Sequence, residues 1–176
     1  MDTSSGRAGI AMEMVELDFS NPSLMKTYHL HTRMDLLLPR DRVFAFFSDA
    51  ANLERITPRE LGFAIATKLP IAMHEGTLID YTIRVWGVPM TWKTRIARWS
   101  PPDVFVDEQL SGPYKKWVHT HRFLDAPNGG TIIEDHVEYA MPFGVLGRVA
   151  APVIRLQLNR IFRHRQSAVA AALSSA

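Results

Sequence analysis

The sequence contains no cysteine. Disulfide bonds, thiolate metal ligands and a cysteine nucleophile are therefore excluded, although this absence does not identify a compartment. The chain also lacks an apolar run approaching the roughly 20 residues that cross a bilayer. Its first residues have no sustained apolar segment of the kind found in a signal peptide. We therefore expect a cytoplasmic protein with no stable membrane insertion.

The sequence also has no large excess of charge of either sign. The chain has 20 basic and 18 acidic residues, which leaves a net charge of +2. This balance argues against nucleic acid as a partner. The sequence has no glycine-rich phosphate loop, and no serine or threonine lies in a nucleophile-elbow context. Nucleotide binding and nucleophilic hydrolysis therefore have little support.

The composition that remains is that of one globular domain. A chain of 176 residues with 47% apolar side chains can bury a full hydrophobic core. Residues 1–22 are small, polar and weakly patterned, whereas regular patterning begins near Thr27. We therefore predict a flexible leader over residues 1–22 and a single domain over residues 23–176. The sequence leaves the oligomeric state open.

Apolar periodicity predicts an α+β fold with about seven short-linked strands, which favours an antiparallel sheet. The expected strands cover residues 27–38, 61–69, 77–86, 90–99, 104–110, 114–124 and 131–141. Two short helices are expected between the first two strands, the first with Val43, Phe46 and Phe47 as its apolar stripe. A long helix is expected from Gly147 or Ala150 to Leu173, so that Pro152 falls in its first turn, where proline is tolerated.

The hairpin formed by the last two expected strands combines apolar and ionisable side chains on one face. The strands flank a Pro-Asn-Gly-Gly turn, and side chains alternate between the faces of a strand. The residues that share the face are Trp117, His119, His121 and Phe123 on one strand and Ile133, Asp135, Val137 and Tyr139 on the other. An apolar wall with a few polar groups is typical of a small-molecule pocket.

His119, His121 and Asp135 allow three interpretations. The histidines can be hydrogen-bonded within a polar patch of the pocket, which we favour. They can bind ligand or act in acid–base chemistry, with Asp135 fixing the imidazole tautomer and Tyr81 or Tyr139 donating to a carbonyl. A metal site is the third interpretation, but His136 points to the other face, which disfavours an all-histidine site.

Arg165 interrupts the inner stripe of the long helix. This stripe consists of Ile154, Leu158, Ile161, Val169 and Ala172. A buried guanidinium needs a partner, so we favour an ion pair with Asp107 or Asp135, or a reach to solvent. The alternative is a bidentate contact with a ligand carboxylate.

Several segments resemble the START-related, pollen-allergen-like and polyketide-cyclase superfamily (SRPBCC), in a bacterial branch. They are residues 39–58 (PRDRVFAFFSDAANLERITP), 87–102 (GVPMTWKTRIARWSPP), 105–114 (FVDEQLSGPY) and 117–123 (WVHTHRF), with the Gly-Gly-Thr turn. The resemblance implies a helix-grip fold, in which a curved antiparallel sheet wraps around a long C-terminal helix and two short helices follow the first strand. It also implies a hydrophobic cavity under that helix. It does not imply one activity, since the superfamily includes lipid carriers, hormone binders, cyclases and co-chaperones.

Together these observations predict that a small hydrophobic or amphipathic molecule binds between the sheet and the last helix. The residues expected at this site are Tyr81, Trp92, Gln109, Trp117, His119, His121, Asp135 and Tyr139, with Arg165 on the helix. We expect neither a cofactor nor a metal there. One alternative is a cyclase- or dehydratase-like enzyme, whose catalytic candidates are His119, His121 and Asp135. Another is a protein-interaction module that uses the leader or the arginine-bearing helix.

Overall fold

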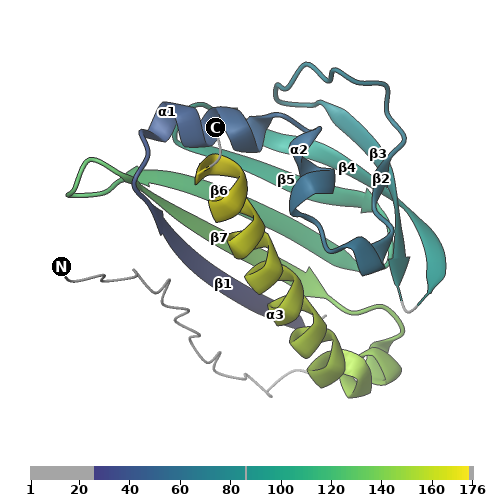
Figure 1. Ribbon diagram of the computed structural model, residues 1–176. Coiled ribbons are helices and arrows are strands. Elements are labelled where there is room, and N and C mark those ends of the chain that lie inside the picture. The colour runs from purple at the N-terminus through teal and green to yellow at the C-terminus, as the bar shows by residue number, and fades with distance from the viewer. Residues whose placement is uncertain (1–25, 86, 175–176) are drawn as a thin grey trace.

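The computed structural model describes residues 26–85 and 87–174, so the expected leader lies outside the described residues. Seven strands form one antiparallel sheet in the order β1-β7-β6-β5-β4-β3-β2 (Figure 1). The elements are β1 (Thr27–Leu36), α1 (Arg40–Ser48), α2 (Asn52–Ile56), a 3-10 turn (Arg59–Leu61), β2 (Ala64–Ile65), β3 (Leu78–Val85), β4 (Val88–Ser100), β5 (Val104–Ser111), β6 (Lys116–Asp125), β7 (Thr131–Ala140) and α3 (Gly144–Ser174). The predicted α+β helix-grip fold is confirmed.

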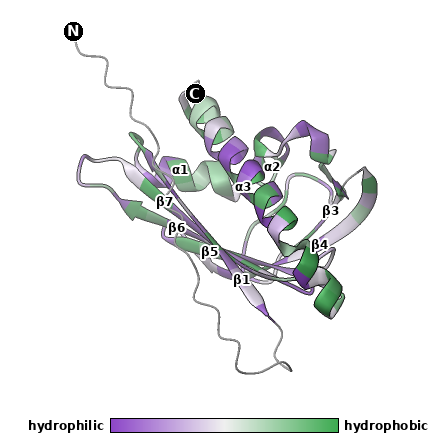
Figure 2. Ribbon diagram, turned by 90° about the horizontal axis from the view of Figure 1, so that it is seen from below, coloured by the Kyte–Doolittle hydropathy of each residue, from purple (hydrophilic) through white to green (hydrophobic). Residues whose placement is uncertain are grey.

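The helices lie on one side of the sheet. Figure 2 shows the strands nearly edge-on, with α1, α2 and α3 on the same side. Register shifts in β4 between Lys93 and Thr94 and between Ile96 and Arg98 interrupt its pairing with β5. Such irregularities bend a strand and increase its twist, which helps the sheet curve around α3.

The β6–β7 hairpin fixes a register that alternation alone left open between His119 and His121. Trp117 pairs with Tyr139, and His121 pairs with Asp135. Because side chains opposite each other in an antiparallel pair lie on the same face, this register brings the predicted inner residues together beneath α3.

The short helix α1 closes one end of the sheet with aromatic side chains. Its buried residues are Val43, Phe44 and Phe47, so Phe44 takes the inner position that the sequence analysis gave to Phe46. The Phe44 ring contacts Phe105 and Phe123 edge-on, at centroid distances of 6.0 and 5.2 Å. The space between the sheet and the helices is therefore filled by the protein's own side chains at this end.

The strand predicted over residues 61–69 is mostly irregular. Only Ala64–Ile65 pairs with β3. Beyond it, the backbone N–H groups of Ala66 and Thr67 both donate to the Asp80 carbonyl, and the Thr67 hydroxyl accepts from the Asp80 N–H. Two consecutive residues thus share one partner, and the regular pairing of this segment with β3 ends at Ile65.

The helix α3 is longer than predicted and contains Pro152 well beyond its first turn. The predicted start at Gly147 or Ala150 was wrong, because α3 begins at Gly144 and continues through Pro152 although proline has no N–H to donate to the carbonyl four residues earlier. The buried face of α3 includes Ile154, Leu158 and Phe162, at four-residue steps. Phe162 and Leu173 are buried positions that the sequence analysis missed, whereas the predicted Ile161 and Ala172 are partly buried and Ile161 faces the cavity under α3. Despite the length of α3, no helix in the described residues is both long and apolar enough to span a membrane.

Phe123 should be among the most sensitive core positions. Its side chain is fully buried, and its ring centroid lies 5.2 and 5.3 Å from those of Phe44 and Phe47. We expect Phe123→Ala to lower the free energy of unfolding by about 3–5 kcal/mol, measured by urea denaturation. The neighbouring Leu124 is 40% exposed, so Leu124→Ala serves as the control and should cost less than about 1 kcal/mol. Equal losses for the two variants would contradict this assignment of the core.

Candidate ligand-binding site

A cavity of about 580 Å³ lies between the sheet and α3. Pockets of this size accommodate drug-sized ligands. Most of its wall is apolar. The side chains that line its interior include Ile79, Ile83, Met90, Ile96, Leu53 and Ile56.

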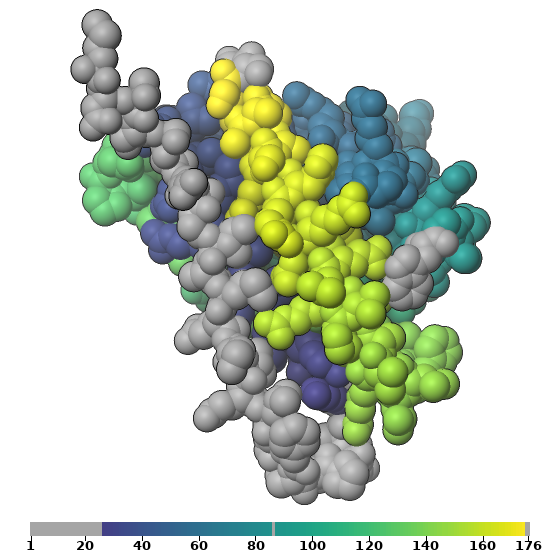
Figure 3. Space-filling view, turned by 60° about the horizontal axis from the view of Figure 1, so that its bottom comes forward, coloured from purple at the N-terminus to yellow at the C-terminus, as the bar shows by residue number. Residues whose placement is uncertain are grey.

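The cavity opens beside the first turns of α3. Phe143 and Leu146 line it, yet they are 83% and 76% exposed. Val88, at the β3–β4 turn, also lines it and is 61% exposed. Residues that are both lining and exposed mark a rim, so the mouth lies between this turn and the start of α3. Figure 3 shows α3 crossing the face of the molecule between β1 and α1 on one side and α2 with the β3–β4 region on the other.

A buried network of two carboxylates and two imidazoles lies under α3. His119 Nε2 is 3.0 Å from Asp135 Oδ1, and His121 Nε2 is 3.0 Å from Asp107 Oδ2. His121 Nδ1 also lies 2.8 Å from Asp135 Oδ1, a close ion-pair distance without hydrogen-bond geometry. With each ring nitrogen within 3.0 Å of a carboxylate oxygen, a positive charge on His121 is favoured. The Thr32 hydroxyl donates to the second Asp135 oxygen at 3.3 Å.

The two histidines have opposite pKa shifts. Burial and the neighbouring His121 lower the pKa of His119 to about 4. Burial alone would lower the pKa of His121 too, but the hydrogen bond with Asp107 and the contact with Asp135 outweigh it and raise that pKa. The ring centroids are 3.7 Å apart, so a second imidazolium would be repelled. At neutral pH, His119 is therefore neutral.

The two carboxylates stay ionised. Burial opposes this, but the hydrogen bond from His119 and the close contact with His121 hold the pKa of Asp135 well below its ordinary value. Burial likewise opposes ionisation of Asp107, but the hydrogen bond from His121 and the nearby charges of His121 and Arg165 lower its pKa. The two negative charges are thus balanced by the His121 imidazolium and the Arg165 guanidinium.

Arg165 does not form the ion pair that we favoured from the sequence. Among the residues that the structure describes, no carboxylate lies within 4.0 Å of its guanidinium. The group lies 5.5 Å from the centre of the Phe47 ring, and its buried Nε has no hydrogen-bond partner. Trp92 Nε1 and His121 Nδ1 are also buried without a hydrogen bond, and all three residues line the cavity. His121 Nδ1 lies close to the Asp135 carboxylate, so Arg165 Nε and Trp92 Nε1 are the two that have neither a hydrogen bond nor a nearby carboxylate.

The predicted site residues separate into two groups. Those that line the cavity are Tyr81, Trp92, Trp117, His119, His121 and Arg165. The other three lie off the wall. The Gln109 amide donates to the Tyr114 carbonyl at 2.7 Å, Asp135 lies behind the histidines that it contacts, and Tyr139 stacks on Tyr28 at 5.4 Å.

The sequence analysis missed part of the wall. Met73 reaches the cavity from an irregular segment, Phe143 from just before α3 and Leu146 from its first turn, and no periodic pattern could have identified these three. Phe63 also lines the cavity and lies within the alternating run that predicted a strand over residues 61–69. Phe162 is different, because it continues the four-residue spacing of Ile154 and Leu158.

The low pKa of His119 predicts acid sensitivity. Between pH 6.5 and about 4, the unfolded chain protonates this histidine while the folded protein does not, so stability falls as the pH falls. The slope from this residue is at most about 1.4 kcal/mol per pH unit. We expect His119→Gln to flatten the fall in melting temperature across this window relative to the wild type. His164→Gln, which changes an exposed histidine of α3, should keep the wild-type slope. If the melting temperatures of all three proteins fell in parallel with pH, His119 would take up its proton equally in the folded and unfolded states, and the prediction would be wrong.

Comparison with known proteins agrees with this geometry. No curated protein matches the sequence. The structure is similar to the Zhui aromatase/cyclase of Streptomyces sp. R1128, with 17% identity, a TM-score of 0.67 and coverage of 84% of this chain and 93% of that one. It is also similar to norcoclaurine synthase of Thalictrum flavum, with 16% identity, a TM-score of 0.62 and coverage of 86% and 97%. A Rhodobacter sphaeroides protein shares 22% identity, with a TM-score of 0.57 and coverage of 81% and 92%.

At these identities the structural likeness extends to the fold alone. The family model for polyketide cyclase/dehydrase and lipid transport matches residues 37–170, most of the chain. The chain therefore belongs to the polyketide cyclase/dehydrase and lipid transport family, within the SRPBCC superfamily.

Proposed function

We propose that the protein binds and carries a small amphipathic molecule. The apolar body of this molecule fills the cavity. An uncharged oxygen atom of the molecule, such as a ketone or another carbonyl oxygen, accepts hydrogen bonds from Arg165 and Trp92. The observation that carries this proposal is the pair of buried, unpartnered donors in an apolar wall. The family, which includes lipid-transport proteins, supports a hydrophobic ligand.

The free donors indicate where the polar end of the ligand lies. A buried donor without a partner costs about 1–3 kcal/mol, and a ligand acceptor would recover that energy. Arg165 Nε and Trp92 Nε1 are such donors. The hydroxyl of Tyr81 is already near the Thr94 hydroxyl, at 3.2 Å, so its hydrogen-bonding capacity is partly used.

Charge balance favours an uncharged acceptor over a carboxylate. The charges of Asp107 and Asp135 are already offset by His121 and Arg165, and a ligand carboxylate would add an unbalanced negative charge. In a cavity of low polarity such a charge is costly unless His119 takes up a proton. A carbonyl oxygen uses the same donors without that cost.

Arg165→Met tests the polar contact, because methionine keeps much of the apolar stem and removes the donors. We expect the dissociation constant of naphthyl methyl ketone, measured by isothermal titration calorimetry, to rise about tenfold or more, as for loss of a hydrogen bond to a charged group. Arg163→Met is the control, since Arg163 is exposed on α3 and its Nε bonds the Asn159 carbonyl.

Naphthoate is the matched charged probe. It should bind wild-type protein more weakly than the ketone near neutral pH. Tighter binding of naphthoate would contradict the charge argument and favour an acid clamp at Arg165. If neither probe binds, and native mass spectrometry with organic extraction finds no apolar molecule on the purified protein, the proposed function is wrong.

An acid–base enzyme is the second candidate, because the neutral imidazole of His119 lines the cavity and is oriented by Asp135. In this scheme His119 would accept a proton from a carbon beside the ligand carbonyl, and Arg165 would stabilise the charge that develops on oxygen. The pKa of about 4 makes His119 a poor base at neutral pH, since an effective general base has a pKa near the working pH. This weakness is why we prefer the carrier.

His119→Gln and Asp135→Asn distinguish the two candidates. The molecule extracted from purified protein would be incubated with wild-type and variant proteins and followed by mass spectrometry. For a carrier we expect the molecule to remain chemically unchanged with all three proteins, while the variants lose at most part of their affinity. Conversion by the wild type that falls about 100-fold or more in the variants would establish the enzyme instead.

A further inference from the structure

A cluster of three histidines lies on the outer face of the sheet, away from α3. His29 and His31 are on β1, and His136 is on the neighbouring strand β7. In the β1–β7 register, His31 lies directly opposite His136. Their neighbours Leu30, Thr32 and Asp135 point inward and are buried, so alternation places the three imidazoles on the opposite side.

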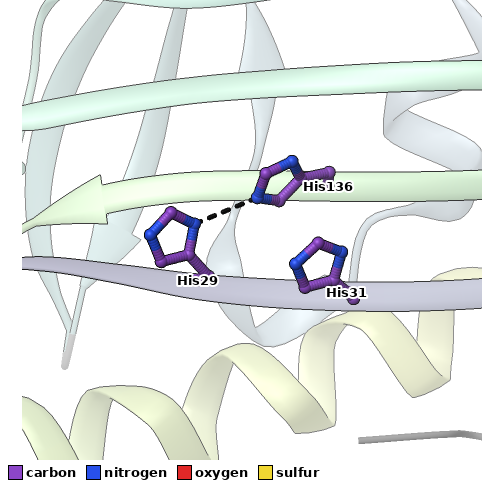
Figure 4. A group of neighbouring side chains, drawn as sticks. All are labelled: His29, His31 and His136. Carbon is purple, nitrogen blue, oxygen red and sulfur yellow. Dashed lines mark hydrogen bonds between the residues drawn. The ribbon is translucent and has the colours of Figure 1, made fainter. Parts of the chain in front are cut away.

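The three rings are close enough to share one ion (Figure 4). His29 Nδ1 lies 3.0 Å from His136 Nε2, and the His31 and His136 rings stack with centroids 4.0 Å apart. One ring nitrogen from each residue lies within 4.8 Å of the other two. Zinc–nitrogen bonds of about 2.0–2.1 Å in a tetrahedral site place ligand nitrogens about 3.3 Å apart. Ring rotations that replace the His29–His136 hydrogen bond with bonds to the ion would bring the three nitrogens to that spacing.

We propose that His29, His31 and His136 form a binding site for a divalent transition-metal ion, with Zn²⁺ as the first candidate. Imidazole nitrogen suits zinc, copper and nickel, whereas magnesium and calcium prefer oxygen ligands. His31 is exposed, and the other two are partly exposed, so an ion can reach them and keep water as a further ligand.

Contacts from outside the cluster hold the imidazoles only weakly. His31 has no hydrogen-bond partner among the described residues, and His29 and His136 bond only each other through their side chains. The nearby carboxylates are already engaged, Glu138 with Lys116 at 2.6 Å and Glu134 with Arg33 at 3.5 Å. Glu138 pairs with His29 in the register, so it adds negative charge beside the site without having to leave Lys116.

A bound ion would stabilise the pairing of an edge strand of the sheet. In the described part of the chain, β1 is an edge strand and pairs only with β7. An ion held by two residues of β1 and one of β7 would cross-link these strands. Because the unfolded chain does not hold the three imidazoles together, the ion should stabilise the folded protein.

The buried set Asp107, His119 and His121 also has the spacing of metal ligands. There, however, an ion would have to enter a buried network and replace several paired carboxylate–imidazole contacts, whereas in the outer cluster it replaces one hydrogen bond between accessible rings. We therefore assign the ion to the outer cluster, and the experiment separates the two positions.

The test is a zinc titration of the full chain, previously treated with chelator, at pH 7.5. We expect isothermal titration calorimetry to give one Zn²⁺ per chain. His31→Ala, which changes an exposed ligand, should weaken binding at least about tenfold, since one of three ligands is lost. His136→Gln should do the same. His164→Ala, at an exposed histidine outside the cluster, should bind as the wild type does.

Thermal unfolding provides a second readout. At zinc concentrations about 100 times the dissociation constant, the melting temperature of wild-type protein should rise by about 5–10 °C. The rise should be lost in His31→Ala and kept in His164→Ala, while all three proteins melt alike without zinc. Absence of binding to wild-type protein would overturn the proposal. Wild-type affinity in His31→Ala would also overturn it, because the ion would then lie elsewhere, with the buried set as the next position to examine.

Discussion

Two buried carboxylates constrain the interior of this protein. Asp107 on β5 and Asp135 on β7 can remain ionised only if donors accompany them, and His119 and His121 on the intervening strand β6 supply those donors. A slip of β6 by one residue would turn both imidazoles outward and leave the carboxylates unpaired. The register of three strands and the satisfaction of the buried charges therefore depend on each other.

The same network determines what is left for a ligand. The positive charge of His121 offsets one of the two negative charges. Arg165 lies over the Phe47 ring and offsets the other at a distance, without a hydrogen bond to a carboxylate. The guanidinium therefore compensates charge and still keeps a free donor. Next to a cavity with a mostly apolar wall, such a donor favours a ligand that is apolar along its body and carries an uncharged acceptor.

Local patterns predicted the parts of the structure that depend on local geometry. Alternation along β6 and β7 was enough to place His119, His121 and Asp135 on one face, because strand side chains have a fixed period. It left open which histidine lies opposite Asp135, and the register of the hairpin selects His121. Alternation could not separate cavity wall from solid core. Tyr139 and Trp117 face the same way, yet Tyr139 stacks on Tyr28, and only the position of α3 decides which of them meets open space. Ile161 and Phe162 are adjacent and apolar, so periodicity alone left the choice between them to three-dimensional packing.

The motif His-x-His occurs twice, and its surroundings decide its chemistry. His119 and His121 point into the molecule, where carboxylates occupy their nitrogens and buried charges must be balanced. His29 and His31 point outward, where the nearby carboxylates are held by Lys116 and Arg33 and a third imidazole completes the cluster. His136 follows Asp135 directly in β7, so one strand contributes to both groups on opposite faces. The alternation that buries an acid–imidazole network on one side thus gathers three imidazoles, away from any carboxylate ligand, on the other.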